Sequence, residues 1–280
     1  MPPSSLPPGL DEVTVRRVIE TALAEDVGAG DVTSQAVIPE STRFSGIMAA
    51  REPMVLAGLS LAERVFLMVE PACVFTPMAK DGDRLSPGTT IARIEGRARG
   101  LLTAERTALN LLQHLSGIAT LTRRYADAIE GTGAILLDTR KTIPGLRQMA
   151  KYASRMGGAR NHRLGLYDAV LIKDNHVAVC GSVLEAVRRA KSAQSLPVEA
   201  ECDTLPQVQE ALDAGADKIL LDNMAPDVLR QAVALVNGRV PLEASGGVTQ
   251  DTIRAIAETG VNFISVGRLT QSAPAADIGL

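Results

Sequence analysis

The sequence of 280 residues predicts an α/β protein, with an α+β domain at the N-terminus followed by a parallel α/β barrel of the kind that is often incomplete. Two observations carry this prediction. In the second half, short apolar runs alternate with helical patterns about every 20–35 residues, which is typical of βαβ units and a parallel sheet. In the first half, apolar runs are separated by Asp-Gly and Pro-Gly turns, which indicates antiparallel strands.

The first half begins with an amphipathic pattern over residues 10–28, which predicts a helix ending in glycine. Antiparallel strands are predicted within 41–58 and 73–96, where turn residues interrupt the apolar runs. A long helical pattern follows over 101–131, with a break predicted near Gly117. Because a helix break is a natural place for a domain to end, we place the domain boundary there.

The expected domains are therefore an α+β domain over 1–117 and a barrel domain over 118–270. The tail of the chain, residues 271–280, is expected to pack back on the first domain.

The barrel prediction rests on six short apolar runs that are each followed by a helical pattern. The runs are 134–137, 169–172, 197–200, 218–221, 240–243 and 263–266. Helices are predicted after several of them, for example over 183–193, over 205–215 and from Thr249 onward. Six such units in succession favour a closed barrel over an open sheet.

The composition excludes several classes of protein. Acidic residues outnumber basic ones, 32 to 29, and aromatic residues make up 2%, so we expect no nucleic-acid partner. No apolar run reaches the roughly 20 residues of a membrane span. Cys73, Cys180 and Cys202 are far apart, which favours reduced thiols in the cytoplasm over disulfides or a zinc site. The first residues predict a short disordered lead and not a signal peptide.

One basic segment, residues 138–163, stands out in this slightly acidic chain. It holds seven Lys or Arg and a single acid, Asp138. Residues 139–141 follow the first barrel strand, Lys173 follows the second, and residues 161–163 lie between them. In a barrel the carboxyl ends of the strands carry the active site. We therefore expect these cations to gather at one edge and bind an anion.

Three cations of the same segment are expected to lie outside the site. Arg147, Lys151 and Arg155 recur every four residues, as on the solvated face of a helix.

The ends of the later strands carry carboxylates and glycines. Glu201 and Asp222 end the third and fourth strands, and Glu199 shares a face with Glu201 because the two are two residues apart. The turn at 245–247, Ser-Gly-Gly before a predicted helix, suits a phosphate. Cations facing carboxylates suggest a polyanionic substrate that also carries hydroxyls or a metal. The three histidines show no metal-ligand spacing, while Mg²⁺ bridging a phosphate to Asp or Glu stays open.

The same residues carry a resemblance to a known family. The block 138–163 with its continuation to 176 resembles the quinolinate phosphoribosyltransferases. Further similar segments are 22–34, 104–120, 198–205, 219–224, 242–248 and 264–270, so the resemblance covers nearly the whole chain. It implies that quinolinate and phosphoribosyl pyrophosphate are joined with Mg²⁺ to give nicotinate mononucleotide, pyrophosphate and CO₂. It also implies a step of NAD biosynthesis and a homodimer or hexamer.

The resemblance also implies a role for each matching residue. Arg106, Arg140, His162 and Arg163 would hold the two carboxylates, with Arg106 reaching a neighbouring subunit's site. Lys141, Lys173, Glu201 and Asp222 would be catalytic, the lysines neutralising substrate charge and the carboxylates holding ribose hydroxyls or Mg²⁺. The remaining substrate contacts would be Thr139, Glu243, Ser245, Gly246, Gly247, Val266, Gly267 and Arg268.

The chain departs from the family pattern at four positions, Ile143, Ala159, Arg268 and Gln271, none of which removes an expected ligand. Three other interpretations stay open. The chain could transfer phosphoribose to another anionic heterocycle, act as a Schiff-base aldolase through Lys173, or bind phosphate without catalysis. The density of cations favours quinolinate, because two carboxylates need it.

Overall fold

The computed structural model describes residues 4–280, which divide into two compact units. The first unit holds the chain up to Arg123 together with Thr142–Gly158 and Leu269–Leu280. The second holds Arg124–Lys141 and Ala159–Arg268. The expected boundary at 117 thus differs from the division of the structure, which also assigns part of the basic segment to the first unit.

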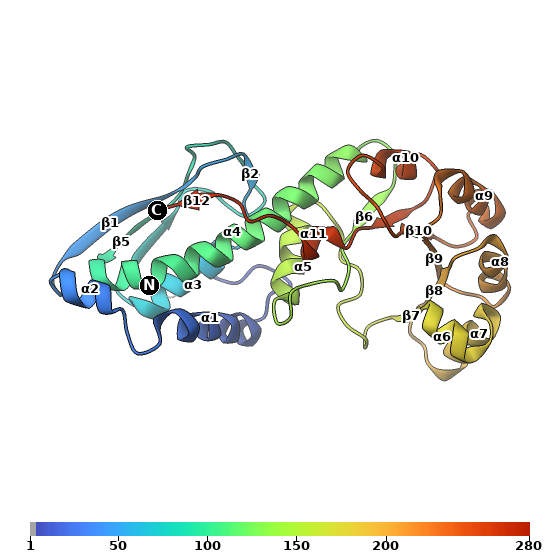
Figure 1. Ribbon diagram of the computed structural model, residues 1–280, viewed down its shortest axis with the longest axis horizontal. Coiled ribbons are helices and arrows are strands. Elements are labelled where there is room, and N and C mark those ends of the chain that lie inside the picture. Colours follow the sequence, from blue (N-terminus) through green and yellow to red (C-terminus); the bar gives the residue numbers. More distant parts are fainter. Residues whose placement is uncertain (1–3) are drawn as a thin grey trace. The chain divides into compact units, whose positions relative to one another are not determined.

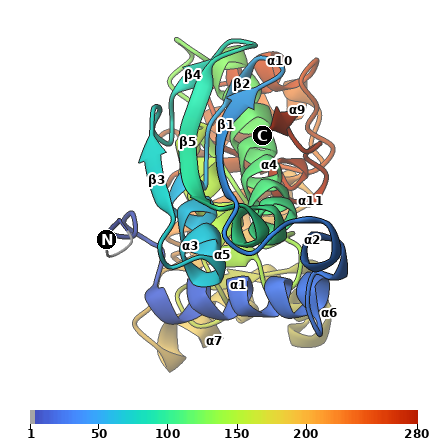
Figure 2. The same cartoon turned by 90° about the vertical axis from the view of Figure 1, so that its left-hand side faces the viewer.

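The first unit joins an antiparallel sheet to helices. The sheet has the order β12-β1-β5-β3, and β1 and β5 run side by side along their length (Figure 2). Its strands are β1 (Arg43–Ala50), β3 (Val74–Pro77), β5 (Thr90–Arg97) and β12 (Ile278–Gly279), with a separate pair β2 (Met54–Val55) and β4 (Arg84–Leu85). The helices are α1 (Glu12–Val27), α2 (Val32–Val37), α3 (Leu59–Val69), α4 (Ala98–Ala128) and α5 (Arg147–Met156). Within residues 4–280 no helix has both the length and the apolar character needed to cross a membrane.

Helix α5 corrects one expectation. Lys151 was expected on a solvated helix face, but it is only 2% exposed, and its neighbours Met149 and Ala153 belong to the core of the first unit. Tyr152 on the same helix donates a hydrogen bond to Asp81 at 2.5 Å. The spacing of the basic residues predicted the helix correctly, but it did not predict which face of the helix is buried.

Helix α4 corrects a second expectation, because it runs unbroken through Gly117. A Cβ atom at this position would lie 2.0 Å from the carbonyl oxygen of Pro274. The C-terminal tail lies against the helix here: the backbone N–H of Ala276 donates to the carbonyl oxygen of Gln113, whose side chain donates to that of Ile278. Gly117 therefore makes room for the tail, which continues into β12.

The second unit is a sheet of six parallel strands with the order β6-β11-β10-β9-β8-β7. The strands are β6 (Ile135–Leu137), β7 (Val170–Ile172), β8 (Val198–Cys202), β9 (Lys218–Asp222), β10 (Leu242–Ser245) and β11 (Phe263–Ser265). They correspond one for one to the six predicted runs. The helices that follow are α6 (Asp174–Cys180), α7 (Val183–Ala193), α8 (Leu205–Asp213), α9 (Pro226–Val236), α10 (Ile253–Ala257) and α11 (Arg268–Gln271). Helices α7, α8 and α9 stand in a row beside the strands (Figure 1).

Strands β6 and β7 form the two edges of this sheet, so the barrel is incomplete, as predicted. The chain after Ala159 lies along the β6 edge. Arg160 donates its backbone N–H to Leu136, and Asp138 donates its own to Arg160. This short pairing brings residues 160–163 to the open side of the sheet, beside the strand ends.

We predict that Gly117→Ala destabilises the protein by about 1–3 kcal/mol. Overpacking against the tail backbone costs about this much, whereas alanine gains only about 1 kcal/mol in helix propensity. Chemical denaturation would measure the change, with Asn110→Ala on an exposed position of the same helix as the control. An unchanged or raised stability of Gly117→Ala would mean that the tail does not constrain this position.

Candidate active site

The inward face of the parallel sheet is polar where a barrel core would be apolar. Neighbouring residues in register on parallel strands point to the same side, and side chains alternate along each strand. Glu199 pairs in register with Lys218, and Glu201 with Leu220, which itself pairs with Glu243. Three carboxylates and a lysine thus share this face, and the sequence reasoning had placed only Glu199 and Glu201 together.

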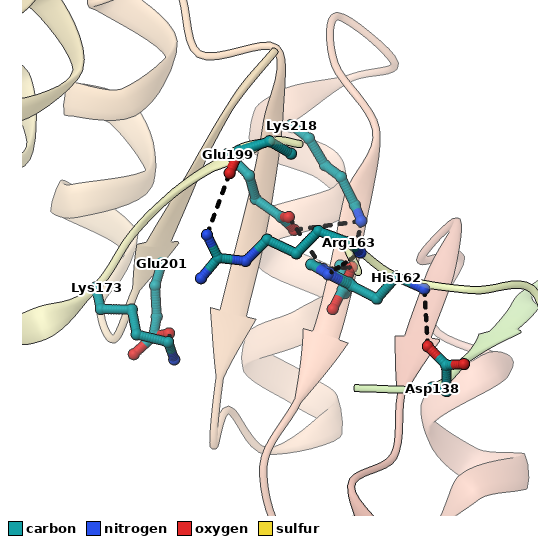
Figure 3. Close-up of polar contacts among 9 residues, drawn as sticks. Asp138, His162, Arg163, Lys173, Glu199, Glu201 and Lys218 are labelled. Atoms are coloured by element: carbon teal, nitrogen blue, oxygen red, sulfur yellow. Dashed lines mark hydrogen bonds and ion pairs between the residues drawn. The ribbon is translucent and has the colours of Figure 1, made fainter. Parts of the chain in front are cut away.

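Three of these groups meet His162 in one buried cluster, which we call the acid–base cluster: His162, Glu199, Lys218 and Glu243. His162 Nε2 lies 3.2 Å from Glu199 Oε2 and 3.5 Å from Glu243 Oε2. The ammonium of Lys218 lies 3.3 Å from Glu199 Oε1 and also contacts Glu243 Oε2. Figure 3 shows His162 and Lys218 reaching Glu199 from different parts of the chain. Glu243 is fully buried and Glu199 is 8% exposed.

The protonation of this cluster is set by opposing effects. Burial lowers the pKa of His162, whereas the hydrogen bonds and charges of Glu199 and Glu243 raise it. Burial raises the pKa of Glu243, but His162 and Lys218 hold it well below its usual range. A further contact opposes protonation of His162, because Nδ1 accepts the backbone N–H of Arg163 at 2.8 Å. A second proton on the ring would turn this hydrogen bond into a repulsion between two donors.

Asp138 holds the segment that carries His162. Its side chain is fully buried, and its two oxygens accept the backbone N–H of His162 at 2.9 Å and the side-chain amide of Asn161 at 2.6 Å. The guanidinium of Arg163 donates to the carbonyl oxygen of Ala169 at 3.1 Å. The only acid of the basic segment therefore fixes its backbone.

The carboxyl edge of the sheet carries a second group of charges. Lys173, which follows β7, lies 2.8 Å from Glu201 (Figure 3). Asp222 ends β9, and burial together with the charge of Glu201 raises its pKa. The side chain of Asn223 donates to Asp222 at 2.5 Å. This end of the edge is therefore rich in negative charge that a cation or hydroxyl donors would stabilise.

The glycine turn after β10 has the backbone of an anion site. Gly246 and Gly247 have positive φ angles, 89° and 61°. A Cβ at Gly246 would lie 2.2 Å from Asn223 Oδ1, so no side chain fits there. The helix expected from Thr249 begins only at Ile253 and has five residues. The prediction that a helix N-terminus lies directly behind the turn is therefore wrong.

The other expected residues lie as follows. Thr139, Arg140 and Lys141 follow β6, and a Cβ at Gly267 would lie 2.7 Å from Lys141 Cδ, so the ends of β6 and β11 meet. Val266 donates its backbone N–H to Leu137 at 3.0 Å, and Arg268 is exposed. Arg106 is an exposed residue of α4 in the first unit.

Sequence reasoning missed Lys218, and it gave no role to Asp138 and Asn223, although both lie at the ends of predicted strands. The lysine begins an otherwise apolar strand, which marks it as unusual, but only the register of β8 and β9 shows that it faces Glu199.

Comparisons with known proteins show the family of the chain. The family models for the N-terminal and C-terminal domains of quinolinate phosphoribosyl transferase match residues 31–116 and 118–280. The nicotinate-nucleotide pyrophosphorylase (carboxylating) of Mycobacterium leprae is 46% identical over 272 residues, 95% of this chain and 96% of its own. The probable counterpart from Bacillus subtilis is 41% identical over 97% of this chain and 94% of its own. The structure of the Francisella tularensis nicotinate-nucleotide pyrophosphorylase superposes with a TM-score of 0.93 at 39% identity, covering 96% of each chain.

An incomplete barrel with opposed charges and a glycine turn at its carboxyl edge defines a class of enzymes that act on anionic, phosphorylated substrates, and the matches narrow this class to the pentosyltransferases. The chain belongs to the quinolinate phosphoribosyltransferase family.

We predict that Lys218→Met destabilises the protein by about 3 kcal/mol or more, because removing one partner of a buried ion pair leaves uncompensated charge. Denaturation in urea would measure the loss. The matched control is Lys191→Met, whose ion pair with Asp217 is exposed and should contribute less than about 1 kcal/mol. Equal losses of stability in both variants would show that the buried ion pairs of Lys218 contribute no more than an exposed ion pair.

Proposed function

We propose that the chain transfers the phosphoribosyl group of phosphoribosyl pyrophosphate to quinolinate, releasing pyrophosphate and CO₂ and giving nicotinate mononucleotide. It is a pentosyltransferase of NAD biosynthesis, and its family uses these two substrates. The observation that carries the proposal is the division of charge at the carboxyl edge. Cations follow β6 and β7, whereas Glu201 and Asp222 lie at the carboxyl ends of β8 and β9 and a glycine turn follows β10.

The cations suit a ring with two neighbouring carboxylates. Burial and the charge of Arg140 lower the pKa of Arg163, so two guanidinium groups lie near each other. Their mutual repulsion is relieved when a dianion binds. Arginine is suited to this role because its planar fork matches the two oxygens of a carboxylate. We assign Arg140, Arg163 and Lys173 to quinolinate, with Lys141 placed to neutralise pyrophosphate.

The carboxylates suit the sugar of the second substrate. Glu201 and Asp222 would accept hydrogen bonds from the ribose hydroxyls, and the turn at 245–247 would hold the 5′-phosphate with its backbone N–H groups. The raised pKa of Asp222 supports a cation beside it in the complex. Mg²⁺ prefers such carboxylate oxygens and phosphate together. We propose Glu201 and Asp222 as its protein ligands, and when bound it would stabilise the charge of the leaving pyrophosphate.

The chemistry requires no nucleophilic side chain. The pyridine nitrogen forms a bond to C1 of the ribose as the bond from C1 to pyrophosphate breaks. The protein contributes position and electrostatic stabilisation. After ribosylation the ring nitrogen is cationic, so it stabilises the electron pair that remains when the adjacent carboxylate leaves as CO₂. A proton from solvent then replaces that carboxylate on the ring.

We further propose that Arg106 completes the site of a second subunit in a homodimer or a larger assembly. Support comes from its exposure on α4, where Leu102 is exposed one turn before it. The free cysteines Cys73, Cys180 and Cys202 support the proposal that the enzyme works in the cytoplasm.

The aldolase alternative loses support from the surroundings of Lys173. A Schiff-base lysine is activated by desolvation or by a neighbouring cation. Lys173 instead lies 2.8 Å from a carboxylate, and its side chain is 47% exposed. The alternative of transfer to another anionic heterocycle is tested by assays with different substrates.

The proposed reaction predicts that each turnover releases one pyrophosphate and one CO₂. Quinolinate labelled with ¹³C in the carboxylate beside the ring nitrogen should give ¹³CO₂ and pyrophosphate in a ratio of about 1. Label in the other carboxylate should stay in the nucleotide. Pyrophosphate released without ¹³CO₂ would contradict decarboxylation by this enzyme.

Asp222→Ala should weaken the binding of phosphoribosyl pyrophosphate far more than the binding of quinolinate. Loss of hydrogen bonds from hydroxyls to a charged acceptor corresponds to about a tenfold or larger rise in KM. Steady-state kinetics with each substrate varied in turn would test this, with Asp227→Ala, an exposed acid on α9, as the control. Similar changes in both KM values would contradict the assigned role.

A site shared between subunits predicts complementation. Arg106→Ala and Lys141→Ala should each be nearly inactive. Mixed dimers made by co-expression, each variant carrying a different affinity tag, should recover about a quarter to a half of wild-type activity, because one of their two sites carries neither substitution. Purified mixed dimers without activity would place the whole site in one chain.

A further inference from the structure

The imidazole of His162 has a partner at each ring nitrogen before any substrate arrives. Nε2 faces Glu199 and Glu243 at 3.2 and 3.5 Å, and Nδ1 accepts the backbone N–H of Arg163 at 2.8 Å. The side chain is 11% exposed. A ring held in this way has no N–H left to donate to a substrate carboxylate, which is the role that the family resemblance gave it.

The charges around the ring balance without a second proton on it. Glu199 and Glu243 bring two negative charges, which Lys218 and the guanidinium of Arg163 offset. The other charged groups on this side are Asp138, which accepts the backbone N–H of His162, and Arg140, whose charge acts on Arg163. Because Nδ1 must keep its lone pair to accept from Arg163, the geometry requires a neutral ring with its proton on Nε2.

The ring therefore joins two parts of the unit that are far apart in sequence. On one side it contacts strands β8 and β10 through their buried carboxylates, and on the other it fixes the peptide N–H of the next residue. Arg163 is held at a second point where its guanidinium donates to Ala169. Figure 3 shows His162 together with Glu199 and Arg163.

We propose that His162 is a positioning residue: the acid–base cluster anchors its ring, and the ring sets the backbone of Arg163 so that the guanidinium meets a substrate carboxylate. The inference rests on the proposed function for the identity of that carboxylate. It adds Glu199, Lys218 and Glu243 to the residues that determine quinolinate recognition, although none of them touches quinolinate.

The same donor atoms could hold a metal ion, since one ligand atom each from His162, Glu199 and Glu243 lie within 4.8 Å of one another. Lys218 argues against this, because its ammonium lies between the two carboxylates and supplies the positive charge there. It also lies 4.7 Å from the centre of the Phe263 ring, which further stabilises a cation at that place.

The first test is the protonation state of His162 in the ligand-free enzyme, measured by two-bond ¹H–¹⁵N correlations. The chain has three histidines, so His162→Gln and His176→Gln assign the spectrum fully. The expected result is a ring whose single proton lies on Nε2, because Nδ1 keeps the lone pair that accepts the Arg163 N–H. A ring protonated on both nitrogens, or ring signals that move stoichiometrically with Zn²⁺ or Mg²⁺, would overturn the proposal. This test requires no turnover, so it succeeds or fails independently of the proposed function.

The second test asks whether His162 acts through the cluster. His162→Ala and Glu243→Gln should each raise the KM for quinolinate about tenfold or more and change that for phosphoribosyl pyrophosphate less than about twofold. Residues that act through one another are not additive, so the double variant should resemble the worse single variant. Additive losses would indicate a direct contact of His162 with substrate and overturn the proposal. Glu185→Gln on α7 is the matched control, and Glu199→Gln replaces Glu243→Gln if that variant does not fold.

Discussion

The buried ion pairs of Glu199 and Glu243 with Lys218 constrain the rest of the second unit. Carboxylates on the inner face of a sheet are stable only when cations reach them, because transfer of an unpaired charge from water costs far more than a domain can supply. Lys218 reaches both from the start of β9, and His162 reaches both from a segment outside the sheet. Lys218 supplies positive charge to both carboxylates, and the Nε2–H group of His162 supplies a hydrogen-bond donor. The need to satisfy these carboxylates therefore fixes where residues 160–163 lie.

Once that segment is fixed, the open side of the barrel can hold cations for the substrate. The sheet stops at β6 and β7, and the chain after Ala159 adds to the β6 edge through backbone hydrogen bonds and the buried Asp138. This arrangement places Arg163 at the carboxyl edge of the sheet, where Arg140, Lys141 and Lys173 also lie. A fully closed barrel would cover this side with two further strands. The gap is thus where the cations that the proposed dianionic substrate needs are placed.

Much of this could be predicted from the sequence, and the failures have physical causes. All six parallel strands follow from apolar runs at βα spacing, and the residues at the strand ends follow from the barrel rule. The sequence did not predict that Lys218 faces Glu199, because this depends on the register of β8 and β9, which a single sequence does not specify. Lys151 was placed on a solvated face because charge alone does not show which helix face has a buried partner. Gly117 was interpreted as a helix break, although its small size is required by a tail more than 150 residues away in sequence. The prediction that the helix begins at Thr249 was wrong, because the turn after the glycines continues up to the start of the helix at Ile253.

The central claim is that the cations at the carboxyl edge recognise two carboxylates on one ring. The most direct measurement is the ratio of kcat/KM for quinolinate to that for nicotinate, which lacks the carboxylate beside the ring nitrogen, with phosphoribosyl pyrophosphate saturating. Because a charged group left without its partner costs several kcal/mol, the account predicts a ratio of about 10³ or more. Comparable values for the two acids, or faster turnover of nicotinate, would contradict it, since the cations around Arg163 would then have no second carboxylate to bind.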